Sequence, residues 1–341
     1  MILTNYLIAS SLFIFFFSIF CIHFLKKKNL LIDKIDHSSH KKLKILSFNN
    51  PPLCGGIILY VCLLIFFKDD LLLKIFSFGI LCVGILSDTN KISSPKIRII
   101  LQLLLVSLFV FYSNISLEDL RVDHLNNILS IKYVSIIFTI FCMLILINGT
   151  NFLDGLNTLV IGYYILVISI IVFVSYKFNL VLNQNIFFLL LFLLVIYFFN
   201  LFEKIYLGDS GSYLLGFVVG FFVLDFFIKN NDISPYFLSF LLWYPAFENL
   251  FSILRRASLS KKFYKPDQSH LHQIIFNFFV KKDFFYKQTL NSVTANLINL
   301  FHAIVFFIFY QYLYETNIMV IATISNVIFY LIIYFLIRKK V

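Results

Sequence analysis

The sequence predicts an all-α membrane protein, a bundle of about ten or eleven helices that cross the lipid bilayer. Of its 341 residues, 60% are hydrophobic and only 13% are charged, whereas soluble domains are roughly 45–50% apolar and about 25% charged. The mean hydropathy of +0.92 points the same way. A soluble core could not bury this many apolar side chains, so lipid must surround much of the chain.

The apolar residues fall into eleven runs that are separated by polar turns. A helix that crosses a bilayer needs about 20 mainly apolar residues, and several of these runs are shorter. The expected spans are, in chain order, Thr4–Phe24, Leu53–Phe67, Leu71–Leu86, Ile97–Tyr112, Tyr133–Ile147, Thr158–Tyr176, Ile186–Leu201, Ser212–Ile228, Tyr236–Leu254, Leu290–Tyr312 and Ile318–Ile337. The whole chain, residues 1–341, is expected to form one membrane domain.

The first run, Thr4–Phe24, is followed by three lysines, Lys26 to Lys28, and lacks the basic start and the small-residue cleavage site of a signal peptide. We interpret it as an uncleaved anchor whose C-terminal end lies in the cytoplasm. If the loops alternate from there, 22 of the 28 lysines and arginines lie on the cytoplasmic side. The expected topology therefore has the N-terminus outside and the C-terminus in the cytoplasm.

The formal charge of +11 would suggest a nucleic-acid ligand if the protein were soluble. In a membrane protein the placement of charge matters more than its sum, and here it marks the cytoplasmic loops. The five cysteines have no metal-binding spacing, and four of them lie in apolar runs. We therefore expect contact with membrane, no nucleic-acid partner, and cysteines that serve as small apolar side chains.

Polar residues that suit catalysis gather in the loops assigned to the cytoplasm, residues 29–54, 87–96, 148–157, 202–212 and 255–289. These loops contain His37–Lys42, Ser87–Asp88, Asn148–Gly155, Gly208–Ser212 and Ser269–Gln273. Mg²⁺ is usually bound by one or two carboxylates together with phosphate oxygens of a substrate. Lysine and histidine can hold phosphate charge, and glycines allow backbone N–H groups to approach it. This combination indicates a site for a metal and a nucleotide.

Each segment also has a simpler explanation when it is considered alone. Asp88 and Asp154 could be solvated loop acids, and the histidines of residues 269–273 could be solvated as well. Residues 208–212 could cap the next helix, because Asp and Ser are good N-cap residues. Asn148 could form a hydrogen bond between helices. The placement of all these segments on one membrane face favours a common site.

Three segments are similar to motifs of one enzyme family. Asn148–Asn157, with the sequence NGTNFLDGLN, is similar to an Asn-Ala-x-Asn-x-x-Asp-Gly-x-Asp loop, and Gly208–Ser212, GDSGS, to a Gly-Asp-x-Gly-Ser motif. Pro52–Gly56 is similar to Pro-x-x-Gly-Gly. From about residue 33 to residue 273, the chain resembles the polyprenyl-phosphate N-acetylhexosamine-1-phosphate transferases of glycosyltransferase family 4. These membrane enzymes begin O-antigen, teichoic-acid and related polymers.

The resemblance implies a role for each of the loop residues. Asp209 is expected to bind Mg²⁺, with Mn²⁺ as the alternative metal. The expected catalytic residues are Asp88, Asn151, Asp154, His270 and His272. The expected substrate-binding residues are His40, Lys41, Lys42, Arg98, Asn148, Gly208, Ser210 and Gln273.

The reaction implied by the resemblance is a phosphoryl transfer at the cytoplasmic face of a bacterial inner membrane. A polyprenyl phosphate, such as undecaprenyl phosphate, attacks the sugar-linked phosphorus of a UDP-N-acetylhexosamine. UMP leaves, and a polyprenyl-diphosphate sugar remains as the first intermediate of a cell-envelope polysaccharide such as lipopolysaccharide. The expected partners are the UDP-sugar, the lipid phosphate and the membrane, and a homodimer is left open.

The chain departs from the family motifs at several positions. Ser87 stands where the first of two paired aspartates is expected, Asn157 replaces the last aspartate of its loop, and Glu248 replaces another aspartate. One alternative is therefore a catalytically weakened member that acts as a scaffold. Another is a transporter or lipid scramblase, which would carry ionisable residues near the middle of the membrane. We interpret the middles of the expected spans as free of such residues, which favours the enzyme.

Overall fold

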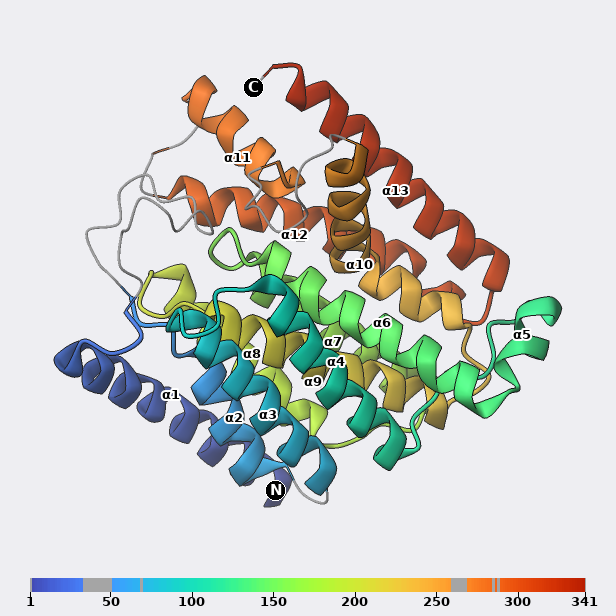
Figure 1. Ribbon diagram of the computed structural model, residues 1–341, viewed down its shortest axis with the longest axis horizontal. Coiled ribbons are helices and arrows are strands. Elements are labelled where there is room, and N and C mark those ends of the chain that lie inside the picture. Colours follow the sequence, from blue (N-terminus) through green and yellow to red (C-terminus); the bar gives the residue numbers. More distant parts are fainter. Residues whose placement is uncertain are drawn as a thin grey trace.

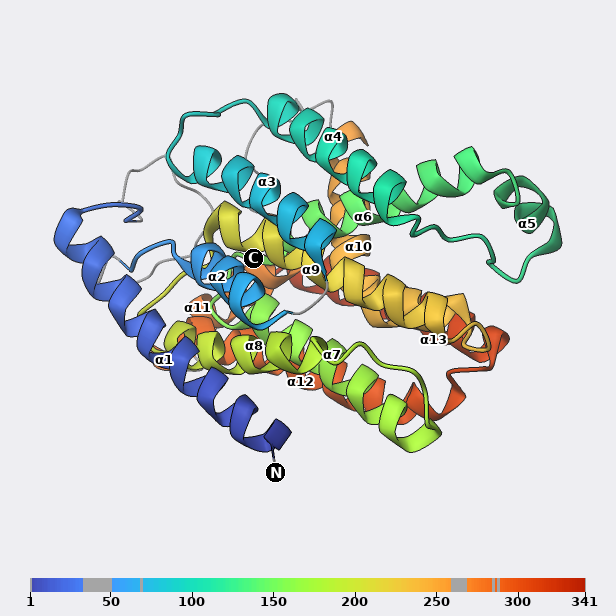
Figure 2. The same cartoon turned by 90° about the horizontal axis from the view of Figure 1, so that it is seen from below.

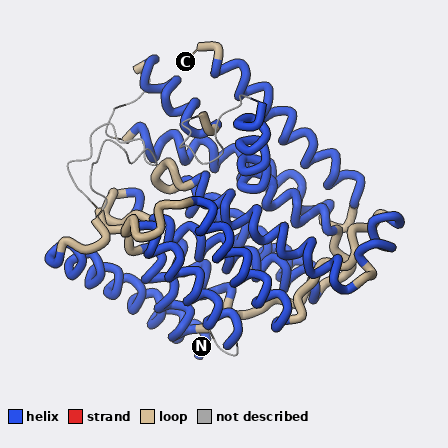
Figure 3. The backbone as a smooth tube through the Cα atoms, in the orientation of Figure 1, coloured by secondary structure: helices blue, strands red, loops and turns tan. Residues whose placement is uncertain are grey.

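The computed structural model describes residues 2–32, 51–67, 70–258, 269–283, 286 and 289–340. Within these ranges the protein is a bundle of thirteen α-helices and one short 3₁₀ helix, with two isolated β-bridges and no longer strand (Figure 1, Figure 3). The helices are α1 (Ile2–Lys28), α2 (Gly55–Phe66), α3 (Leu71–Asp88), α4 (Pro95–Ser113), α5 (Asp123–Leu129), α6 (Lys132–Leu153), α7 (Leu159–Phe178), α8 (Ile186–Leu201), α9 (Gly208–Lys229), α10 (Pro235–Ser258), α11 (Leu271–Lys282), α12 (Leu290–Phe309), η1 (Tyr310–Tyr312) and α13 (Thr316–Arg338). The predicted all-α architecture is confirmed.

Each of the eleven expected spans contains a helix. In the described part of the chain, nine helices are long and apolar enough to cross a membrane, and α2 and α8 are shorter apolar helices. A segment in lipid must satisfy its backbone hydrogen bonds internally, which is why apolar runs of this length form helices. The protein is therefore a multi-pass membrane protein. Two further helices, α5 and α11, form in stretches that the sequence assigned to loops.

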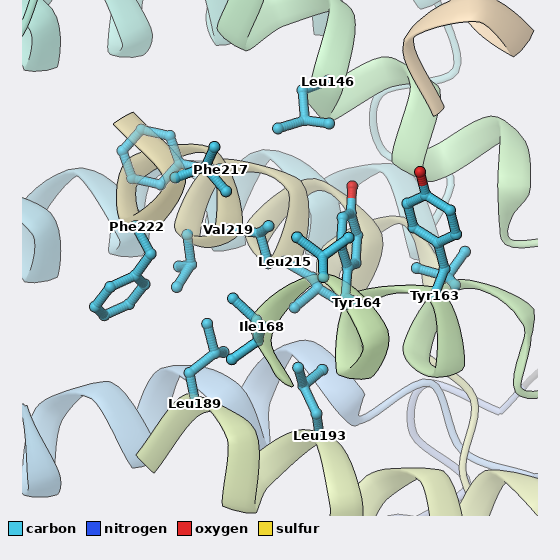
Figure 4. Packing of buried hydrophobic residues seen from close by; sticks show 14 of the residues in the cluster. Leu146, Tyr163, Tyr164, Ile168, Leu189, Leu193, Leu215, Phe217, Val219 and Phe222 are labelled. Atoms are coloured by element: carbon cyan, nitrogen blue, oxygen red, sulfur yellow. The ribbon is translucent and has the colours of Figure 1, made fainter. Parts of the chain in front are cut away.

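Helix α9 lies inside the bundle and is the most buried of the nine long helices. In its apolar window 89% of the residues are buried, compared with 22% for α13. It packs against α2, α3 and α6, and Figure 2 shows it enclosed by its neighbours. Phe217 and Val219 of α9 belong to the same apolar core as Ile168 of α7 and Leu193 of α8 (Figure 4). This packing fixes the position of the start of α9 at one end of the bundle.

Two glycines allow neighbouring helices to approach the start of α9 closely. A Cβ atom on Gly84 of α3 would lie 2.2 Å from the Cα atom of Ser210. A Cβ atom on Gly56 of α2 would lie 2.6 Å from the carbonyl carbon of the same serine. Because the atoms that would collide belong to the backbone, no larger residue fits without moving a helix. The last turn of α3 and the first turn of α9 are therefore held in backbone contact.

Helix α10 changes direction along its length, and Pro245 lies within it (Figure 1). Proline has no N–H group, so the carbonyl of Leu241, four residues earlier, loses its helical hydrogen bond. The hydroxyl of Tyr163 on α7 donates to this carbonyl at 2.7 Å. The side chain thus satisfies the group that Pro245 leaves free. The second half of α10 then carries Glu248 and Arg255 to the start of α11.

Candidate active site

Asp88, the last residue of α3, binds the start of α9. The backbone N–H of Asp209 donates to Oδ1 of Asp88 at 2.7 Å, and the N–H of Ser210 donates to Oδ2 at 3.0 Å. Gly208 has a φ of +70°, and a Cβ atom there would lie 2.8 Å from Oδ2 of Asp88. Glycine is required at that position both by the backbone angle and by the close carboxylate. Asp88 therefore caps α9 from another helix, and the helix dipole stabilises its negative charge.

Asp209 lies in the first turn of α9 and is buried. Its Oδ2 atom accepts hydrogen bonds from the hydroxyl of Ser87 and from Nη1 of Arg98, the latter at 2.9 Å. Its Oδ1 atom accepts one from Nδ2 of Asn151 at 2.8 Å. The donors come from α3, α4 and α6, so four helices meet at this carboxylate. We call Ser87, Asp88, Arg98, Asn151 and Asp209 the aspartate cluster.

Arg98 forms an ion pair with Asp209 in which both side chains are largely buried. It lies in the first turn of α4, where the helix dipole disfavours a positive charge. The contact with Asp209, and the hydrogen bond from Nη1 to the Ser87 hydroxyl at 2.7 Å, compensate for that position. Arg98 therefore brings positive charge to a site that also contains two carboxylates.

Three of the expected site residues lie at the end of α6 or directly after it. Nδ2 of Asn151 also donates to the Ser212 hydroxyl at 2.8 Å, which ties α6 to α9. Nδ2 of Asn148 donates to Oε1 of Gln102 on α4 at 3.0 Å. From the sequence, Asn148 could either belong to the site or form a hydrogen bond between helices, and the structure contains such a hydrogen bond. Asp154 follows directly after α6 and is half-buried.

A second group of polar residues surrounds the start of α11. Nδ1 of His270 lies 2.8 Å from Oε1 of Glu248 on α10, and the hydroxyl of Tyr330 on α13 donates to Oε2 of Glu248 at 2.7 Å. Gln273 belongs to a capping box, since its side chain accepts from the backbone N–H of His270 at 3.4 Å. We call Glu248, His270 and Tyr330 the glutamate cluster.

His272 differs from His270 although their rings stack, with centroids 5.7 Å apart. It is fully buried, and neither ring nitrogen has a hydrogen-bond partner in the described part of the structure. Burial, and to a smaller extent the neighbouring His270, lower the pKa of His272 to about 3. The ring is therefore neutral near pH 7.

Phe152 links the two clusters. It follows Asn151, which binds Asp209, and its ring centroid lies 5.3 Å from that of His270. The guanidinium of Arg256 lies 5.4 Å from the same ring. The end of α6 thus contacts the aspartate cluster through one residue and the start of α11 through the next, so the two clusters lie next to each other.

The structure brings most of the expected site residues together, although none of the expected roles is tested by it. Asp88, Arg98, Asn151, Gly208, Asp209 and Ser210 meet where α3 and α9 make contact, and His270, His272 and Gln273 meet at α11. The expected substrate-binding residues His40, Lys41 and Lys42 lie outside the described residues. Glu248 was recognised only as a substitution, and nothing in the sequence singled out Tyr330.

The interpretation that the middles of the spans are free of ionisable residues is wrong. Glu248 lies within α10 and His302 within α12, and both are buried. Glu248 tolerates this position because both of its oxygens have hydrogen-bond partners. Nδ1 of His302 lies 2.8 Å from the carbonyl oxygen of Ile298, one turn earlier in α12. The signal was present in the sequence, as a single glutamate and a single histidine inside apolar runs.

The aspartate cluster contains oxygen donors of the kind that bind a hard divalent metal ion. No group of three His, Cys, Asp or Glu side chains with metal-binding geometry occurs among the described residues. Mg²⁺, however, needs only one or two carboxylates, with phosphate oxygens and water as further ligands. Asp88 uses one lone pair of each oxygen for the amides of α9, and a carboxylate has about four such sites. The donor set therefore suits Mg²⁺ better than a metal that prefers nitrogen or sulfur.

Similarity to known proteins agrees with this site. A family model described as "Glycosyl transferase family 4" matches residues 71–227, which run from α3 to α9 and include the aspartate cluster. The chain is 24% identical over 205 residues to "Probable undecaprenyl-phosphate N-acetylglucosaminyl 1-phosphate transferase" of Bacillus subtilis, and the match covers 59% of this chain and 57% of that protein.

Two proteins named "Undecaprenyl-phosphate alpha-N-acetylglucosaminyl 1-phosphate transferase" are also similar. The one from Thermotoga maritima is 27% identical over 235 residues and the one from Haemophilus influenzae 26% identical over 261 residues. Each match covers 66% of this chain and 67% of the relative. Enzymes of the matched family generally depend on a metal ion. The segment from residue 71 to residue 227 is thus similar to glycosyl transferase family 4.

Proposed function

We propose that the protein transfers a sugar-1-phosphate, namely N-acetylhexosamine-1-phosphate, from a UDP-sugar to polyprenyl phosphate. UMP and a polyprenyl-diphosphate sugar are the products. The observation that carries the proposal is the meeting of four helices at Asp209, where two carboxylates, Arg98 and the N-terminus of α9 are combined. The three relatives are named as transferases of this kind.

The chemistry suits such a site because it needs positioning and charge neutralisation more than a covalent group from the protein. An oxygen of the lipid phosphate forms a bond to the sugar-linked phosphorus, and the bond from that phosphorus to the bridging oxygen of UMP breaks. Arg98 offers positive charge to the diphosphate, while the amides of Asp209 and Ser210 hold Asp88 in place. The ring of His270 packs against Phe152, the residue that follows Asn151 of the aspartate cluster.

A metal ion would be held by Asp209, with Asp88 next to it in the cluster. Bound Mg²⁺, or Mn²⁺ as the alternative, would neutralise negative charge on the diphosphate. Asn151 and Ser87 orient the Asp209 carboxylate, because their donors occupy fixed positions on its two oxygens. Arg98 forms an ion pair with the same carboxylate and holds it in place.

The site is proposed to face the cytoplasm of a bacterial cell, at the inner membrane. Asp88 is at the end of α3 and Arg98 at the start of α4, while Asn151 is at the end of α6 and Asp209 at the start of α9. These ends lie on one side of the bundle because the helices meet there. The excess of lysine and arginine in the loops on this side supports the cytoplasmic orientation, and nucleotide sugars are supplied there.

The orientation can be tested with single cysteines in a background without the five native ones. A cysteine at the exposed Lys91, between α3 and α4, should react with a membrane-impermeant reagent only after the cells are opened. A cysteine at the exposed Asn127 of α5 should react in intact cells. Labelling of the first position in intact cells would contradict the proposed orientation.

The reaction can be tested directly with purified protein. Mg²⁺, undecaprenyl phosphate and a panel of UDP-sugars are supplied, and both UMP and the lipid-linked product are measured. UMP release that requires the lipid phosphate distinguishes a transferase from a hydrolase or a transporter. If no UDP-N-acetylhexosamine yields both products, the proposed function is wrong.

A further inference from the structure

Glu248 is a carboxylate buried completely within a membrane helix, with 0% of its surface exposed. An ionised group in such a place is costly unless it is paired and hydrogen-bonded. Its two oxygens have partners from two other elements, Nδ1 of His270 at 2.8 Å and the hydroxyl of Tyr330 at 2.7 Å. Glu248 is thus held between α13 and the start of α11.

The contact with Glu248 determines which nitrogen of His270 carries a proton. An ionised carboxylate only accepts hydrogen bonds, so Nδ1 must be the donor. This leaves Nε2 as the ring nitrogen that can meet a substrate. The backbone N–H of His270 is held by Gln273 at 3.4 Å, and the Phe152 ring packs against the imidazole at 5.3 Å. Both the tautomer and the position of the ring are therefore fixed.

His272 shows that this arrangement is specific to one of the two histidines. It lies two residues further along α11 and has no carboxylate partner, since neither nitrogen is hydrogen-bonded in the described structure. A carboxylate that bonds an imidazole also stabilises positive charge on it, which suits contact with an anionic group. Of the two rings, only His270 has this support.

We propose that Glu248 is a positioning residue for the transfer reaction, held in place by Tyr330, and that it presents Nε2 of His270 to the diphosphate of the UDP-sugar. The inference rests on the proposed function. It assigns a role to a glutamate and a tyrosine that touch no substrate themselves. Glu248 acts through His270, and Tyr330 acts through Glu248.

Glu248→Gln is the decisive variant because it keeps the size of the side chain and can still bond Tyr330. Its amide can donate to Nδ1 as well as accept, so the tautomer of His270 is no longer fixed. We expect kcat/KM for the UDP-sugar to fall about tenfold to a hundredfold, the usual cost of losing a residue that orients a functional histidine. The Mg²⁺ concentration for half-maximal rate should not change. Glu248→Asp should recover part of the loss because it restores the charge.

Asp70→Asn is the matched control. It also replaces a hydrogen-bonded carboxylate by its amide, since Oδ2 of Asp70 accepts from Asn185 at 2.6 Å. Asp70 precedes α3, at the end of that helix opposite to Asp88. We expect its kcat/KM to stay within about twofold of the wild type, as for changes away from a site. Tyr330→Phe is a milder second variant, with an expected loss of about threefold to tenfold from one hydrogen bond.

A double-mutant cycle distinguishes positioning from a structural role. In a His270→Ala background, Glu248→Gln and Tyr330→Phe should cost nothing further if they act through the imidazole. Losses that persist there, or a Glu248→Gln enzyme within about twofold of the wild type, would overturn the inference. A wild type that is inactive with every UDP-sugar would instead overturn the proposed function itself.

Discussion

The aspartate cluster and the glutamate cluster hold their carboxylates in different ways. Asp88 and Asp209 lie next to each other with Arg98 as their cationic partner, and backbone amides supply the other donors to Asp88. Glu248 is alone and bonds one histidine and one tyrosine. Two carboxylates against one arginine leave an excess of negative charge, which a cation can neutralise. The first cluster is therefore suited to a metal, and the second to the orientation of a side chain.

The largest effect is expected from Asp209→Asn. The amide keeps the shape but removes the charge, and its NH₂ group would face either Arg98 or the amide of Asn151, which are donors themselves. We expect activity to fall more than about a thousandfold, roughly 4 kcal/mol. UMP release at increasing Mg²⁺ concentration measures both the rate and the metal requirement.

As a control, the variant should be recovered from the membrane fraction like the wild type. In detergent it should elute from a size-exclusion column at the same volume. Near-normal turnover with an unchanged Mg²⁺ requirement would show that Asp209 is not a metal ligand. It would also remove the distinction between the two clusters, because neither would then bind a cation.

Asp88→Ala should have the next largest effect. It removes a carboxylate from the cluster and both hydrogen bonds to the amides at the start of α9. We expect a loss of more than about a hundredfold in the rate of UMP release, roughly 2.7 kcal/mol. Asp225→Ala on α9 is the control, since Asp225 lies near the other end of that helix and forms an i,i+4 ion pair with Lys229. A loss of similar size at Asp225 would point to general damage to α9.

The sequence predicts the spans well but not the contacts between them. Each run such as Leu71–Leu86 forms a helix because its own backbone must be satisfied in lipid, which is a local requirement. The link from Tyr330 to Glu248 joins residues 82 positions apart and depends on how α10 and α13 pack. Asp88 was expected near a metal. Its hydrogen bonds to the amides of α9, however, depend on the close approach of α3 to α9 at Gly84, which the sequence does not reveal.

Gly84→Ala tests whether that close approach is needed. The new Cβ atom would lie 2.2 Å from the Cα atom and 2.6 Å from the backbone nitrogen of Ser210. Because both of these atoms belong to the backbone, a side-chain rotation cannot relieve the clash. We expect a lower melting temperature and a loss of activity above about tenfold, since α3 must move and carry Asp88 with it. Gly79→Ala on the same helix is the matched control, because its Cβ atom would meet only the flexible end of Leu105. Equal losses in both variants would show that the contact with α9 is not special.

The smallest effect is expected from Ser87→Ala. The variant removes one donor to Asp209, while Arg98 and Asn151 still hold the carboxylate. An aspartate at this position would invite a role as a base for the lipid phosphate. The second pKa of a phosphate monoester is about 6, so roughly nine in ten are already dianions at pH 7. Deprotonation then offers well below 1 kcal/mol.

We therefore expect the wild type to be active and Ser87→Ala to lose less than about tenfold in the rate of UMP release. Ser87→Asp should not raise the rate strongly, because its carboxylate would add a third negative charge beside Asp88 and Asp209 and repel the attacking oxyanion. A larger loss at Ser87 than at Asp88 would refute this ranking. An inactive wild type that Ser87→Asp rescues would mean that the natural protein has lost catalysis and acts as a scaffold, because the cluster would then lack only the acid that serine replaces.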